Sequence, residues 1–165
     1  SGRETAMTGY VRATVAGGDG DRIAAMAADV CGHADAGATA LREAKYAWAG
    51  QLRASGDRDQ ALKLYKELAS DVKTREGSEA AYYVIEALFE SGDLDKTESE
   101  VFAFSDREPN AYWLAKAFLL LGDVYVRKGD TFQARATYQS VADGYSPADD
   151  GIVDEAKERI AKLKN

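Results

Sequence analysis

Residues 118–141 read FLLLGDVYVRKGDTFQARATYQSV, and this stretch decides the fold. Apolar residues recur at helical spacing on both sides of the dipeptide Gly129-Asp130. Glycine tolerates the left-handed backbone that ends many helices, and aspartate accepts hydrogen bonds from the first free amides of the next helix. Ala134, Tyr138 and Val141 follow at steps of four and three, which keep them on one helix face that can be buried. The stretch therefore predicts two antiparallel helices joined by a tight turn.

Four copies of the same dipeptide stand at intervals of 36 to 38 residues, namely Gly18-Asp19, Gly56-Asp57, Gly92-Asp93 and Gly129-Asp130. At the offsets of Ala134, Tyr138 and Val141, the other copies carry a similar set of residues. These are Ile23, Ala27 and Val30, then Ala61, Tyr65 and Leu68, then Thr97, Val101 and Phe104. One helical hairpin cannot bury such a stripe alone, so we expect neighbouring hairpins to stack on one another.

Composition and charge agree with a helical chain and argue against two classes of function, nucleic-acid binding and membrane insertion. The 165 residues are 45% hydrophobic and 30% charged, with only two prolines, which are costly inside helices. The net charge of −7 offers no basic surface for phosphates, so we do not expect a nucleic-acid partner. No apolar run approaches the roughly 20 residues that cross a bilayer, so we do not expect membrane insertion.

Residues 118–138 strongly resemble a tetratricopeptide repeat, through the motif Phe118-x-x-Leu121-Gly122-x-x-Tyr125-x-x-x-Gly129-Asp130-x-x-x-Ala134-x-x-x-Tyr138. The earlier units depart from it: the first is degenerate, Lys45 replaces an apolar residue in the second, and Thr97 replaces the small alanine in the third. The resemblance implies an all-α, right-handed α-α superhelix of about four hairpins plus a C-terminal capping helix. It also favours a bacterial protein, and a weaker likeness to envelope lipoproteins favours the periplasm or outer membrane over the cytoplasm, with the compartment left open.

The repeat register predicts a single domain, residues 1–165, with units near 3–35, 38–74, 78–108 and 110–146 and a capping helix at 151–164. The expected helices cover residues 3–16, 21–33, 38–55, 58–73, 78–91, 94–105, 110–128 and 131–143. The capping helix places its apolar residues on one side and charged residues on the other, as a solubilising end should. Those apolar residues are Ile152, Val153, Ala156, Ile160 and Leu163.

Few residues could carry catalysis or bind a metal. Cys31 and His33 could form a nucleophilic pair, which leaves a remote possibility of a hydrolase, but no third group that would orient them is evident. A structural zinc site needs about four ligands, and no second cysteine or histidine pair exists. The segment 17–21 lacks the Lys-Ser/Thr of a phosphate loop, and Ile23 stands where calcium would need a ligand. We therefore predict no enzyme activity, catalytic residue, cofactor or metal.

Binding of a partner is better supported. The resemblance implies that the first helices of successive units line a concave groove, and residues on those helices that packing does not use should face it. The candidate groove residues are Arg12, Tyr46, Arg53, Tyr82, Glu86, Phe89, Asp123 and Arg127. Aromatic side chains anchor partners well, and arginine can bind carboxylates. Tyr46 and Tyr82 could equally bridge neighbouring repeats, and Trp48 and Trp113 are expected to pack between helices.

The resemblance therefore implies a protein–protein interaction module that holds a peptide or partner protein in its groove, as part of a larger bacterial protein. The alternative is a structural C-terminal end of an envelope scaffold, which self-associates as a homodimer or docks onto the rest. A groove binder should expose Tyr46, Tyr82 and Phe89, whereas a scaffold end should expose a large apolar face on its first helix.

Overall fold

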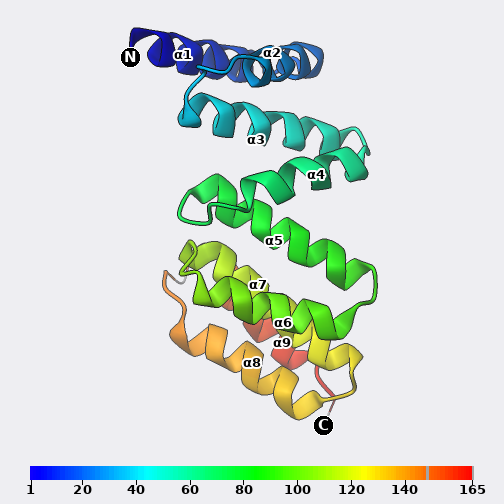
Figure 1. Ribbon diagram of the computed structural model, residues 1–165. Coiled ribbons are helices and arrows are strands. Elements are labelled where there is room, and N and C mark those ends of the chain that lie inside the picture. The colour runs from blue at the N-terminus through cyan, green and yellow to red at the C-terminus, as the bar shows by residue number, and fades with distance from the viewer. Residues whose placement is uncertain (148, 165) are drawn as a thin grey trace. The chain divides into compact units, whose positions relative to one another are not determined.

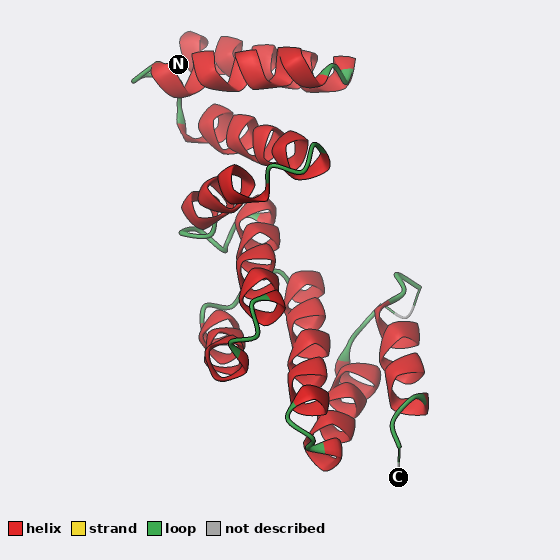
Figure 2. Ribbon diagram, turned by 90° about the vertical axis from the view of Figure 1, so that its right-hand side faces the viewer, coloured by secondary structure: helices red, strands yellow, loops and turns green. Residues whose placement is uncertain are grey.

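The computed structural model of the protein describes residues 1–147 and 149–164. Those residues form nine α-helices and no strand, which confirms the prediction of an all-α fold with helical hairpins (Figures 1 and 2). The helices are α1 (Gly2–Gly17), α2 (Gly20–Gly32), α3 (Ala38–Ala54), α4 (Arg58–Leu68), α5 (Arg75–Glu90), α6 (Leu94–Asp106), α7 (Ala111–Arg127), α8 (Thr131–Gly144) and α9 (Ile152–Ala161).

The helices group into two compact units. Unit 1 spans Ser1–Ser70 and holds α1 to α4, and unit 2 begins at Asp71 and holds α5 to α9. In unit 1, α3 packs against α1, α2 and α4; in unit 2, α7 packs against α5, α6, α8 and α9. Each unit is therefore organised around one central helix. The four-unit division within a single domain stays a prediction.

The four Gly-Asp turns have the geometry that their chemistry predicts. All four glycines have positive φ, between 72° and 89°. Each following aspartate is the N-cap of the next helix, and its side chain accepts a hydrogen bond from the backbone amide three residues on, at 3.0 to 3.2 Å. The glycines are Gly18, Gly56, Gly92 and Gly129, and the capping aspartates are Asp19, Asp57, Asp93 and Asp130.

The predicted apolar face of the second helix in each hairpin is buried. All twelve residues at the repeated offsets are at most 7% exposed. Thr97, which replaces an alanine, is fully buried, and its hydroxyl donates a hydrogen bond to the carbonyl oxygen of Asp93 at 2.7 Å. Because its one polar group is paired, threonine is tolerated at a position that favours a small apolar residue.

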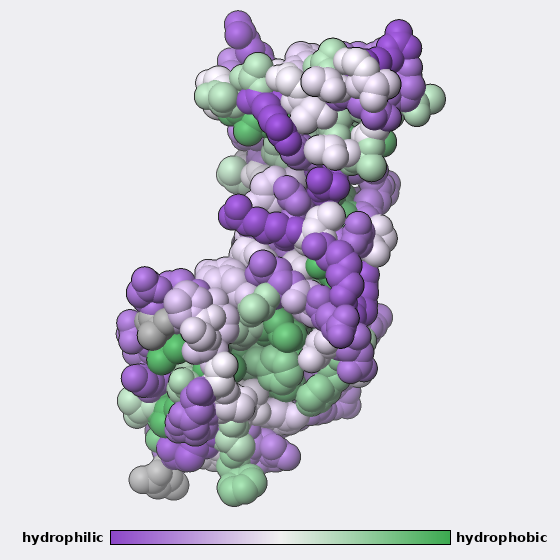
Figure 3. Space-filling view, turned by 90° about the vertical axis from the view of Figure 1, so that its left-hand side faces the viewer, coloured by the Kyte–Doolittle hydropathy of each residue, from purple (hydrophilic) through white to green (hydrophobic). Residues whose placement is uncertain are grey.

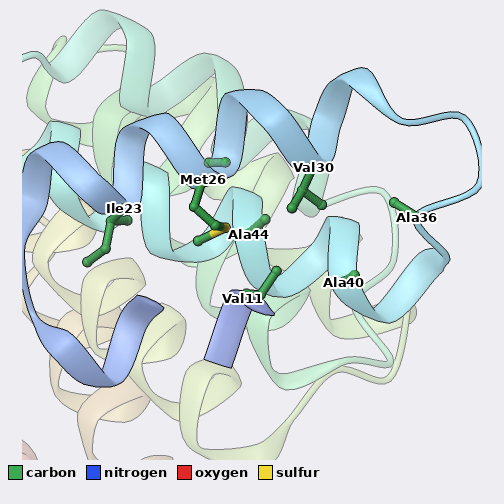
Figure 4. Close-up of a cluster of buried hydrophobic side chains, with 8 residues drawn as sticks. Val11, Ile23, Met26, Val30, Ala36, Ala40 and Ala44 are labelled. Carbon is green, nitrogen blue, oxygen red and sulfur yellow. The ribbon is translucent and has the colours of Figure 1, made fainter. Parts of the chain in front are cut away.

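The core of unit 1 lies between α1, α2 and α3. Figure 4 shows Ile23, Met26 and Val30 of α2 beside Ala44 of α3, with Val11 of α1 on the same cluster. Val11 and Met26 are each 1% exposed. Val11 is thus the buried residue by which α1, the first helix of the degenerate first unit, joins this core.

The core of unit 2 depends on a close approach between α7 and α8. Tyr138 of α8 is 2% exposed, and its ring lies directly against Gly122 of α7. A Cβ atom at Gly122 would stand 2.1 Å from Cε1 of Tyr138, far inside van der Waals contact. The glycine of the repeat motif is therefore required by packing, although it lies inside a helix, where glycine is unfavourable.

The capping helix is formed by α9, which packs on α8 and α7. Its buried residues are Ile152, Val153 and Ala156, and Ile160 and Leu163 pack partly buried against the same core.

The largest difference from the expected helices lies between α4 and α5. Helix α4 ends at Leu68 rather than near residue 73, and α5 begins at Arg75 rather than near residue 78. Local capping causes the shift: the side chain of Asp71 accepts from the amide of Lys73 at 3.1 Å, and the Thr74 hydroxyl accepts from the amide of Gly77 at 3.0 Å. Both contacts offer the backbone an alternative to continuing α4.

We expect Gly122→Ala to destabilise unit 2 by about 1–3 kcal/mol, because the new methyl group must displace the packed ring of Tyr138. The matched control is Gly144→Ala in α8 of the same unit, where nothing lies within 4 Å of the added Cβ. The control should change stability by less than about 0.5 kcal/mol. Urea unfolding followed by circular dichroism measures both. Equal midpoints for the two variants would contradict the packing argument.

Candidate partner-binding surface

The candidate surface in unit 2 is formed by α5, α7 and α9, of which α7 packs against both others. We call it the α5–α7–α9 surface and define it by nine side chains. They are Tyr82, Glu86 and Phe89 of α5, Trp113, Lys116, Asp123 and Arg127 of α7, and Glu155 and Arg159 of α9. Figure 3 shows one side of the molecule, on which apolar side chains of unit 2 gather in a hollow framed by polar ones.

Aromatic rings link α5 to α7 on this surface. The ring of Trp113 lies 5.5 Å from Tyr82, 5.8 Å from Tyr83 and 5.0 Å from Tyr112, between centroids. Tyr82 is only 8% exposed, whereas Trp113 and Tyr83 are half-buried. Tyr82 is therefore not exposed as expected for a groove binder and takes the packing role that the sequence left open for it. Trp113 remains partly exposed.

The hydroxyl of Tyr82 donates a hydrogen bond to Oε2 of Glu86 at 3.3 Å. Burial raises the pKa of Tyr82, and the neighbouring carboxylate of Glu86 raises it further. Tyr82 therefore remains a neutral donor at physiological pH and fixes the carboxylate of Glu86 beside the aromatic cluster.

A polar network holds α9 against α7. The Asp123 carboxylate accepts hydrogen bonds from the Tyr138 hydroxyl and from Nε of Arg159, the latter at 3.1 Å. Arg159 also donates to Glu155 at 3.1 Å, and Nζ of Lys116 lies 3.6 Å from the other Glu155 oxygen. Burial raises the pKa of Tyr138, with the Asp123 carboxylate as a further cause. Four charged side chains from two helices are thus held in fixed positions.

Phe89 and Arg127 form a second contact between α5 and α7. The guanidinium carbon of Arg127 lies 4.7 Å from the centroid of the Phe89 ring, and Nη1 donates to the Phe89 carbonyl oxygen at 3.2 Å. The two residues therefore bind each other, and Phe89 is half-buried.

The remaining predicted residues lie in unit 1. Arg12 of α1 makes a two-point ion pair with Glu43 of α3, with N–O distances of 2.9 and 2.7 Å. The Arg12 hydrogen bond lowers the pKa of Glu43. Arg12 and the half-buried Tyr46 line one pocket of about 320 Å³, together with Val11, Val15, Ala16, Glu43 and Ala47. Arg53 is exposed near the end of α3.

The eight predicted residues thus divide into a set of three in unit 1 and a set of five in unit 2. The sequence reasoning did not assign Trp113, Lys116, Glu155 and Arg159 to a binding surface. For Trp113 and Lys116 of α7, the sequence did contain a signal. They share one helix face with the predicted residues 123 and 127, since positions 113, 116, 120, 123 and 127 follow one another at helical spacing. No comparable signal in the sequence placed α9 beside α7.

Of the two residues that could form a nucleophilic pair, Cys31 is an exposed free thiol and His33 lies beside a carboxylate. Nε2 of His33 lies 3.4 Å from a carboxylate oxygen of Asp29. Desolvation raises the pKa of the Cys31 thiol, which lowers the fraction of reactive thiolate. Across residues 1–147 and 149–164, no group of three metal-ligating side chains comes together. Within the same residues, no helix is long and apolar enough to span a bilayer.

Comparison with known families matches residues 116–146 to the tetratricopeptide repeat. The match covers most of α7 and all of α8, the hairpin in which Gly122 meets Tyr138. The nine described helices fit the same family, and its repeats serve as protein–protein interaction modules. No curated protein matches the chain.

We expect a double-mutant cycle of Asp123→Asn and Arg159→Gln to give a coupling free energy of about 1–2 kcal/mol. Both side chains are roughly 30% exposed, so their pairing lies between the exposed and buried limits. Chemical denaturation of wild type, both single variants and the double variant measures the coupling.

The matched control is the Lys73–Glu108 pair of the same unit, whose side chains are 62% and 85% exposed. Its coupling should be at most a few tenths of a kcal/mol, because solvent screens it. A coupling at Asp123–Arg159 no larger than this control would show that the ion pair does not hold α9 in place.

Proposed function

We propose that this chain, whose residues 116–146 are a tetratricopeptide repeat, binds a peptide segment of a partner protein on its α5–α7–α9 surface. The observation that carries the proposal is the part-exposed Trp113 ring within a rigid frame of aromatic and charged side chains. Trp and Tyr rings dominate the binding energy of many interfaces because they bury a large area at little entropic cost.

The frame is organised before any partner arrives. Tyr82, Asp123, Arg159 and Glu155 are already fixed by hydrogen bonds or ion pairs within the chain. Binding of a partner then costs little conformational entropy in these side chains, and preorganisation of this kind raises affinity. Helices also hold side chains more firmly than loops do, which suits an interaction surface.

Unit 1 offers a separate contact area in this proposal. The pocket beside Arg12 and Tyr46 has few polar atoms apart from the Arg12–Glu43 pair, so it suits an apolar side chain of the partner. Because Glu43 already binds Arg12 at two points, a partner carboxylate would have to compete with it. The proposal involves no catalytic step.

Selection from a displayed library of random peptides on the immobilised full chain tests the proposed function. We expect enriched peptides whose binding falls by about tenfold or more in Trp113→Ala, since truncation of a central aromatic anchor costs 2 kcal/mol or more. Arg127→Glu, also on the surface, provides a second variant in case Trp113→Ala unfolds.

The control is Phe132→Ala on α8, which removes an aromatic ring that is 82% exposed and outside the surface. It should leave binding unchanged. Failure to enrich any peptide, or equal losses in Phe132→Ala and the surface variants, would reject the proposal.

A second candidate function is self-association or docking through α1, as expected for the end of a larger bacterial envelope scaffold. Helix α1 exposes Tyr10 and Val15 to 42% and 40%, which is high for large hydrophobic residues. Pockets of about 450 Å³ and 320 Å³ are lined in part by these two side chains.

If α1 mediates self-association, light scattering should give the mass of a dimer, and Val15→Ser should shift it toward the monomer, because the substitution removes apolar area from the contact. Phe132→Ser on α8 serves as the control. A monomer for the wild type at high concentration would rule out self-association.

A further inference from the structure

The charge of the chain is divided unequally between the two units. Residues 1–70 contain nine basic and nine acidic side chains, whereas residues 71–165 contain twelve basic and nineteen acidic ones. The whole formal net charge of −7 therefore belongs to unit 2. A charge of this size concentrates cations near a surface and speeds their encounter with it.

Aromatic rings on the α5–α7–α9 surface already lie against cations. Nζ of Lys116 stands 6.0 Å from the centroid of Tyr82, and the guanidinium carbon of Arg127 stands 4.7 Å from that of Phe89. The negative face of an aromatic ring attracts a cation, and the attraction strengthens where water is excluded. These two contacts show that rings of this surface accept ammonium and guanidinium groups.

Trp113 is a partly exposed aromatic residue within the unit that carries the net negative charge. Indole is the strongest of the side-chain partners for a cation. The ring lies in the centre of the cluster of Tyr82, Tyr83 and Tyr112 and keeps part of its surface exposed. Tyr82, its neighbour at 5.5 Å, holds the carboxylate of Glu86 by a hydrogen bond, so a negative charge stands near the same rings.

An acidic segment fits the surface less well. Arg159 is bound to Asp123 and Glu155, Lys116 is paired with Glu155, and Arg127 lies on the ring and carbonyl of Phe89. A partner carboxylate would have to displace these internal contacts within a unit of net charge −7.

We propose that the partner segment is basic, and that one lysine or arginine side chain of the partner seats on Trp113 beside Glu86. This inference rests on the proposed peptide-binding function and adds the chemistry of the ligand to it. The field of unit 2 attracts the segment, and the aromatic cluster with Glu86 places the side chain.

The test uses the full chain with Trp48→Phe, which leaves Trp113 as the one remaining tryptophan of the two in the sequence. The probes are a peptide of alternating arginine and glycine and a peptide of the same length with glutamate in place of arginine. We expect the arginine peptide to change Trp113 fluorescence in a saturable, salt-sensitive manner and the glutamate peptide to have no effect. Glu86→Gln should weaken binding of the arginine peptide by about fivefold or more.

The matched control is Glu100→Gln on α6, which removes the same charge from an exposed position of unit 2 outside the surface. Its effect should be less than about twofold, as expected for a distant screened charge. Equal weakening of arginine-peptide binding in both variants would show a nonspecific electrostatic attraction with no defined binding position, and it would overturn the inference. Enrichment of acidic or uncharged peptides in the library selection would also overturn it while leaving the proposed function intact, whereas an empty selection would remove both.

Discussion

The Gly-Asp turn is the constraint on which the rest of the structure depends. At each of the four turns, a glycine at positive φ ends one helix and an aspartate side chain caps the next. The two residues together fix where the second helix begins and hence which of its side chains face inward. With that register set, offsets counted from the glycine coincide with burial in all four hairpins, including the one that carries Thr97.

Packing and surface chemistry are joined in unit 2 through Tyr138. Its ring fills the space that Gly122 leaves open, and its hydroxyl reaches the carboxylate of Asp123 on the neighbouring helix. The same carboxylate binds Arg159 of α9. A single core side chain therefore orients a charged residue of the candidate surface, and the motif glycine makes this contact possible.

The sequence was sufficient to predict features that arise within one hairpin. The fold class, the turns and the buried stripe follow from local spacing, as Ala134, Tyr138 and Val141 illustrate. Contacts between distant segments could not be predicted in the same way. The Arg12–Glu43 pair joins residues 31 positions apart, and the Arg159–Asp123 pair joins residues 36 apart, so each depends on how helices pack. The early end of α4 could not be predicted for a different reason. The side-chain caps at Asp71 and Thr74 outweigh a helical spacing of apolar residues that would have continued the helix.

The position of α9 limits how the last hairpin can be transferred to another protein. A capping helix is commonly regarded as an interchangeable cover for the last hydrophobic layer, which Ile152, Val153 and Ala156 do provide here. Yet Glu155 and Arg159 of the same helix hold Lys116 and Asp123 of α7 in place. A substitute helix grafted after α8 with equivalent apolar residues would restore the fold while leaving Asp123 without its guanidinium. Transplanting this repeat between proteins therefore requires that the cap be carried with it.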